Sequence, residues 1–181
     1  ELFCAHCPEL RSKRDEMMRL AISFGQGLQM TNILKDILDD RQAGVCWLPR
    51  SVFVDDDFEL EQLDELYGTE AFKIGIKKLI SVAHRHLRDG FDYTCNIPTR
   101  EAGIRRFCFW GLGLAVLTLR KIHGNPGFIS RDQIKISRRT VRMTTLTTNL
   151  TLGNNRGLGF LLDFATSGLP LAAAEADECS R

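Results

Sequence analysis

The fold is decided by the stretch Phe24-Gly-Gln-Gly-Leu-Gln-Met-Thr-Asn-Ile-Leu-Lys-Asp-Ile-Leu-Asp-Asp40. Its apolar residues recur every three or four positions, which is the spacing of one face of a helix. The same spacing continues through most of the 181 residues, and no run alternates apolar and polar residues as a half-buried strand would. The sequence therefore predicts an all-α helical bundle.

The polar residues of this stretch also share one face of the predicted helix. At about 100° per residue, Gln29, Asn32, Asp36 and Asp40 form one strip, with Asp39 at its edge. Apolar residues lie beside the strip, so we expect carboxylates at the rim of a buried cavity. Oxygen donors without His or Cys favour Mg²⁺, which carboxylates usually share with substrate phosphates. A solvated acidic helix end fits the same spacing.

Capping and turn residues divide the rest of the chain. We expect helices over residues 12–40, 55–67, 69–93, 99–122, 130–149 and 155–164, with Ser12, Thr69, Thr99 and Ser130 as N-caps. The acidic run at 55–57 is expected to be a solvated turn or helix start. The length suits one domain, which we place at 1–170. The tail 171–181, rich in Ala and small polar residues, is expected to be disordered.

Charge is distributed unevenly although the net charge is only +1. Residues 99–181 hold 12 Lys and Arg against 6 Asp and Glu, which favours an anionic partner such as phosphate, nucleic acid or a lipid headgroup. The expected helix over 130–149 is basic. Its face would carry Arg131, Lys135, Arg138 and Arg142, which could contact a diphosphate, neutralise the acidic half of the chain, or simply be solvated.

The cysteines and histidines suggest a reduced, cytoplasmic protein without a metal centre of their own. Six cysteines occur with no secretory signal. Cys4-Ala-His-Cys7 has the spacing of half a zinc or redox site, but no second cluster of ligands is visible, so ordinary thiols are expected. His84 and His86 are expected at the surface. The apolar run 107–119 is shorter than the ~20 residues that cross a bilayer, which predicts a buried helix.

Residues 27–40, followed by Gly44 and Trp47-Leu-Pro49, closely resemble the second aspartate-rich motif of the squalene/phytoene synthase family. Residues 117–122 and 135–139 are similar to the C-terminal half of bacterial squalene synthases. The resemblance implies an isoprenoid-synthase-type bundle around a central cavity, in which two aspartate-rich motifs hold Mg²⁺ and bind prenyl diphosphates. Because nothing before Ser12 resembles the first motif, we expect the chain to be the C-terminal part of such a domain.

The resemblance also implies a reaction: two farnesyl diphosphates are joined head to head through presqualene diphosphate, and hydride from NADPH then gives squalene. Phytoene or dehydrosqualene synthesis is the alternative. Val45 stands where the family commonly has Arg.

The resemblance assigns roles to individual residues. The implied metal ligands are Asp36 and Asp40, and the residues implied to contact substrate are Gln29, Asn32, Asp39, Trp47 and Arg138. The expected wall of the prenyl cavity is formed by Phe107, Phe109, Trp110, Leu114 and Leu117.

Two other functions are compatible with the residues. A helical nucleic-acid-binding module could use Arg131 to Arg142, but its best-patterned polar face is acidic, so we expect no nucleic acid partner. A non-catalytic fragment could bind an anionic partner or associate to cover an exposed cavity wall. Peripheral membrane contact for product release is a further expectation, while the oligomeric state and the nicotinamide site stay open.

Overall fold

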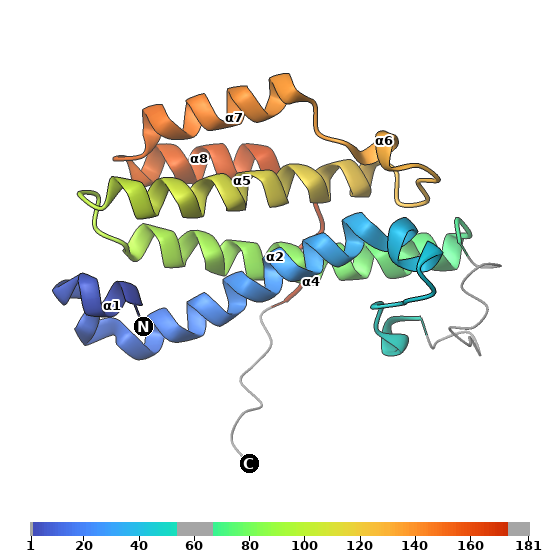
Figure 1. Cartoon of the computed structure of the whole chain (residues 1–181), viewed down its shortest axis with the longest axis horizontal. Helices are drawn as coiled ribbons and strands as arrows, with labels where there is room; N and C mark the ends of the chain where they lie inside the picture. The colour runs from blue at the N-terminus through green and yellow to red at the C-terminus, as the bar shows by residue number, and fades with distance from the viewer. Residues whose placement is uncertain (1, 54–66, 174–181) are drawn as a thin grey trace, which may run out of the picture.

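The computed structural model describes residues 2–53 and 67–173, and the regular structure within these ranges is entirely helical (Figure 1). In chain order the elements are α1 (Leu2–His6), the 3-10 turn η1 (Pro8–Lys13), α2 (Arg14–Gln42), the 3-10 turn η2 (Arg50–Val52), α4 (Glu70–Asn96), α5 (Ala102–Gly124), α6 (Arg131–Ile134), α7 (Arg138–Thr151) and α8 (Asn155–Thr166). The predicted all-α class is confirmed. The helix and acidic turn expected from residue 55 onward lie outside the described residues.

The helices form a layered bundle with α4 and α5 at its centre. α2 crosses α4, and α7 packs on α5 (Figure 1). α8 packs on α5 and α7 and also contacts α4, where Arg88 of α4 pairs with Asp163 of α8 at 2.9 Å. The core lies between these layers and is built from the fully buried Phe72, Ile80 and Leu87 of α4 with Leu119 and Ile122 of α5. Burial of these large apolar side chains is the main favourable contribution to folding.

Small residues line the contact between α2 and α4. Gly27 of α2 is buried, and a Cβ added there would lie 3.0 Å from the Cβ of His86 and 3.0 Å from Leu87 Cδ2. Gly90 of α4 makes room for the ring of Phe24, which a Cβ at that position would overlap. The absence of side chains at these points allows the two helices to approach closely.

This contact corrects one expectation from the sequence. The buried face of α2 includes Gly27, Thr31 and Leu34, which lie roughly opposite Gln29 and Asn32 at about 100° per residue. The polar strip is therefore opposite the buried face and not beside it. The pattern misled because Gly27 and Thr31 are not strongly apolar, although both are buried; the Thr31 hydroxyl is satisfied by donating to the Gly27 carbonyl.

A fully buried arginine joins four helices. The guanidinium of Arg105 in α5 donates to the carbonyls of Thr94 and Ile97 at the end of α4, to that of Leu152 at the end of α7, and to the side chain of Asn155 in α8. Carbonyl groups at helix C-termini carry partial negative charge and lack partners within the helix, so a cation there is favourable. The charge is satisfied by dipoles, since no ion pair joins Arg105 to a carboxylate in the described ranges.

The helix boundaries confirm some predicted caps and correct others. Thr69 caps α4 by accepting from the Phe72 amide, as expected. Ser12 and Thr99 are not caps, because a 3-10 turn precedes α2 and Glu101 immediately precedes α5. Ser130 caps only the four residues of α6. The single basic helix expected over 130–149 is therefore wrong: the chain is extended at Lys135, and Ser137 caps a separate α7.

The chain after α8 returns to α4. His84 Nδ1 lies 2.9 Å from the Pro170 carbonyl, and the Arg85 guanidinium donates to the Ala172 carbonyl at 2.7 Å. His84 is thus buried rather than at the surface, and its burial lowers its pKa. Ala172 therefore contacts α4, while residues 174–181 lie outside the described part of the chain.

We predict opposite effects for two glycines of α2. Gly27→Ala should destabilise the fold by about 1–3 kcal/mol, because the added methyl group overpacks the contact with α4. Gly25→Ala should stabilise it by about 1 kcal/mol, because a Cβ there meets no atom within 4 Å and Ala is the better helix former. Urea denaturation of both variants measures the difference. Equal effects would contradict the close approach of the helices.

We also predict that Arg105→Lys destabilises the fold by about 3 kcal/mol, because an ammonium group cannot reach carbonyls on both sides and leaves buried acceptors unpaired. Arg106→Lys at the exposed neighbouring position is the matched control and should change stability by less than about 0.5 kcal/mol. The free energy of unfolding from denaturant titration is the measurement, and similar values for both variants would refute the role assigned to Arg105.

Candidate functional site

The acidic end of α2 is paired with an arginine from a distant part of the sequence. Arg131 Nη2 donates to Asp36 Oδ1 at 2.9 Å, and Arg131 Nη1 lies 2.6 Å from Asp39 Oδ2. Arg131 is the first residue of α6, whose start is fixed by the Ser130 cap. The planar fork of one guanidinium therefore holds two carboxylates on the same helix. Arg131 therefore neutralises part of the charge of the acidic half of the chain, which is one of the roles considered for the basic residues of 130–149.

Asp40 has a different environment from Asp36 and Asp39. Its carbonyl accepts a hydrogen bond from the Val45 amide at 2.8 Å, which closes the turn after α2. Gly44 supplies the left-handed conformation that this turn needs, with φ of 73°. Asp40 borders a small hollow together with Trp47, whose side chain is largely exposed. The structure thus brings Asp36 and Asp39 onto Arg131 and places Asp40 beside the turn.

The predicted amide groups lie on the same helix but are solvated. Gln29 and Asn32 are exposed. Lys35 Nζ donates to Asn32 Oδ1 at 3.3 Å and also lies 3.3 Å from Asp36 Oδ2. A second cation therefore contributes to the charge balance of the acidic end.

Arg138 does not join this cluster. It is exposed at the start of α7, and within the described ranges no ion pair connects it to the carboxylates of α2. The extended residues before α7 separate Arg138 from Arg131, so the predicted continuous basic face does not form. Of the basic residues predicted for that face, Arg131 is the one that reaches the acidic motif.

The donor set of this cluster suits a hard divalent cation. The side chains of Asp36 and Asp39 are 30% and 44% exposed, so their oxygens are sheltered but reachable from solvent. Carboxylate and amide oxygens are the ligands that Mg²⁺ prefers. Because Arg131 already binds Asp36 and Asp39, a cation taking both carboxylates would have to share them with the guanidinium or displace it.

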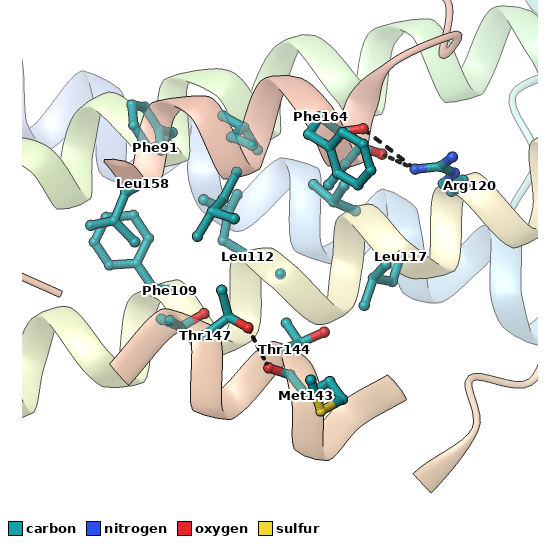
Figure 2. A pocket seen from close by; sticks show the side chains of 16 residues that line it. Phe91, Phe109, Leu112, Leu117, Arg120, Met143, Thr144, Thr147, Leu158 and Phe164 are labelled. Atoms are coloured by element: carbon teal, nitrogen blue, oxygen red, sulfur yellow. Dashed lines mark hydrogen bonds between the residues drawn. The ribbon is translucent and has the colours of Figure 1, made fainter. Parts of the chain in front are cut away.

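An apolar groove of about 260 Å³ lies between α5, α7 and α8 (Figure 2). Its apolar lining includes Phe91, Phe109, Leu112, Leu117, Leu158 and Phe164. At one end Arg120 donates to the carbonyls of Phe164 and Ala165 at 3.4 and 3.3 Å (Figure 2). None of the lining residues comes from α2, so the groove and the acidic motif are separate sites in the described part of the chain.

The residues expected to wall a prenyl cavity divide between two surfaces of α5. Phe109 and Leu117 line the groove, whereas Phe107, Trp110 and Leu114 are exposed on another face of the helix. Among the described helices, α5 is the one long and apolar enough to span a membrane by length and composition. The predicted buried helix is buried on one face only, which carries Arg105 and core side chains such as Leu119, while Phe107 on another face is exposed.

Comparison with known proteins identifies relatives. A family model described as squalene/phytoene synthase matches residues 1–140, which include the whole acidic motif. The chain is 28% identical over 102 residues to a 15-cis-phytoene synthase of Enterobacter agglomerans, a match that covers 56% of this chain and 32% of that protein. It is 27% identical over 128 residues to squalene synthase ERG9 of Gibberella zeae, covering 70% and 27% respectively.

A squalene synthase of Rattus norvegicus is 29% identical over 108 residues, covering 58% of this chain and 25% of that protein. The matched region therefore spans between a quarter and a third of these curated relatives. No solved structure gives a significant match.

We predict that the contact between Arg131 and Asp39 contributes little to stability. Both side chains are more than a third exposed, so a double-mutant cycle of Arg131→Ala and Asp39→Ala should give a coupling energy of about 0.5 kcal/mol. The coupling should fall further at high salt, because exposed charges are screened. A coupling above about 2 kcal/mol that is independent of salt would contradict this description of the site.

Proposed function

Because the chain belongs to the squalene/phytoene synthase family, we propose that the acidic end of α2 binds the diphosphate of a prenyl substrate through Mg²⁺ during head-to-head condensation. Members of this family are prenyltransferases. The observation that carries the proposal is that three half-buried carboxylates, Asp36, Asp39 and Asp40, share one helix end inside the region that the family model matches. Their oxygen donors fit the metal, and a cation from α6 already balances part of their charge.

In this proposal Asp36 and Asp40 hold the metal and Asp39 supports the site beside them. Bound Mg²⁺ would neutralise the negative charge that develops on the diphosphate as it leaves the allylic carbon. Arg131 holds Asp36 and Asp39 in place. Its guanidinium can also donate to diphosphate oxygens, because its planar fork pairs with phosphate groups in the same way as with carboxylates. Gln29 and Asn32 present exposed amides further along the same helix toward the substrate.

The prenyl chain needs an apolar surface that excludes water, because the carbocation left after ionisation would react with water. We propose that the exposed apolar face of α5, formed by Phe107, Trp110 and Leu114, is one wall of that cavity in the whole protein. Its support is that these three apolar side chains, spaced at i, i+3 and i+7, form one exposed stripe on a helix whose opposite face is buried. Trp47 and Arg138 are further candidates for substrate contacts.

The proposed product is squalene, with phytoene or dehydrosqualene as the alternative. Identities of 27–29% to both kinds of synthase do not separate them. The two outcomes differ in whether a nicotinamide is consumed, because squalene formation requires a hydride donor such as NADPH and the alternatives do not. Product analysis with and without NADPH therefore distinguishes them.

We predict that Asp36→Asn and Asp40→Asn in the whole protein each lower turnover of farnesyl diphosphate at least about 100-fold, as expected for the loss of a charge that stabilises the leaving group. Diphosphate release with saturating Mg²⁺ is the measurement.

Asp15→Asn is the matched control, because Asp15 lies on the same helix with a fully exposed side chain, and it should leave turnover unchanged. Near-normal turnover of Asp36→Asn and Asp40→Asn would remove both residues from the mechanism.

A further inference from the structure

A second group of possible metal ligands lies at the start of the described chain, away from the acidic end of α2. The ligand atoms of His6, Cys7 and Glu101 all lie within 4.8 Å of one another. No other group of three or more His, Cys, Asp or Glu ligand atoms gathers in this way within the described ranges. His6 ends α1 and Glu101 immediately precedes α5, so the group joins segments far apart in the sequence.

The carboxylate of Glu101 is oriented by two different partners. Its Oε2 lies 3.4 Å from His6 Nε2, and its Oε1 lies 3.5 Å from Arg100 Nε. Arg100 is itself held by Glu9, with 2.6 Å between Nη1 and Oε1. One oxygen of Glu101 is thereby turned toward His6 while the other is occupied, as expected for a metal ligand with an orienting neighbour.

The separation of His6 Nε2 and Glu101 Oε2 suits a tetrahedral ion. Two ligands bonded to zinc at about 2.0–2.1 Å lie about 3.3 Å apart when the bonds meet at the tetrahedral angle. The 3.4 Å between His6 Nε2 and Glu101 Oε2 agrees with this value. The backbone of Cys7 is also fixed, because its amide donates to the Phe3 carbonyl and its carbonyl accepts from the Leu10 amide.

Two of the three residues are shielded from solvent, while the third is accessible. Cys7 is fully buried, Glu101 is largely buried, and the His6 side chain is 63% exposed. An ion could therefore enter past the imidazole and reach the thiol. Sulfur, nitrogen and oxygen donors together favour Zn²⁺ among common divalent ions, whereas the oxygen-only cluster on α2 favours Mg²⁺.

We propose that His6, Cys7 and Glu101 bind one Zn²⁺ ion, with the fourth position open to solvent, and that this ion fastens the end of α1 to the start of α5. Cys4 is buried one turn earlier, but its thiol lies outside the group. The site does not depend on the proposed prenyltransferase function, because it shares no residue with the acidic end of α2.

The test uses the metal-free chain titrated with Zn²⁺ in competition with a chromophoric chelator. We expect one equivalent to bind, and His6→Gln and Glu101→Gln each to weaken the affinity at least about 10-fold. Co²⁺ in place of Zn²⁺ should give a thiolate charge-transfer band that Cys7→Ser abolishes. The thermal midpoint of the wild-type chain should rise with added Zn²⁺, and this rise should disappear in the ligand variants.

The matched controls are Cys4→Ser, Cys46→Ser and Asp15→Asn, which remove a neighbouring thiol, a distant exposed thiol and a fully exposed carboxylate of α2. All three should keep the wild-type affinity. Binding of less than one equivalent, or equal affinity in the ligand variants and the controls, would overturn the proposal. Far-ultraviolet circular dichroism verifies the fold of each variant, and His6→Gln and Glu101→Gln carry the test if Cys7→Ser does not fold.

Discussion

The bundle depends on the buried guanidinium of Arg105. A charge removed from water is costly unless its donors are satisfied, and here carbonyls at the ends of two helices and one amide side chain satisfy them. The geometry of a planar group with fixed N–H directions then determines where α4 and α7 end and where α8 begins relative to α5. The apolar groove lies between α5, α7 and α8, which are among the helices that this guanidinium joins.

The second constraint is the close contact of α2 with α4, which sets the rotation of α2. Because Gly27 and Thr31 face α4, the strip that carries Gln29, Asn32 and the aspartates faces outward. The end of this strip meets Arg131, which Ser130 positions at the start of α6. The candidate site is thus produced by helix packing on one side of α2 and by a short capped turn on the other.

Much of the fold followed from the sequence because helical spacing is a local property. The all-α class and the Thr69 cap were predicted, and so was the placement of five site residues on one helix. The errors arose where a distant segment decides the outcome. The extended residues after α6 separate Arg138 from Arg131. Small buried residues such as Gly27 do not contribute to the apolar pattern from which a buried helix face is predicted. Likewise, no local pattern places Glu101 next to His6 and Cys7.

If the acidic end of α2 binds a prenyl diphosphate through Mg²⁺, formation of the condensed hydrocarbon depends on that ion. The whole protein would be incubated with farnesyl diphosphate and NADPH, with and without Mg²⁺, and the extracted hydrocarbons identified by mass spectrometry. Squalene is expected in the presence of Mg²⁺ and none after removal of the ion by chelation. Unchanged farnesyl diphosphate in both incubations would contradict this role of α2.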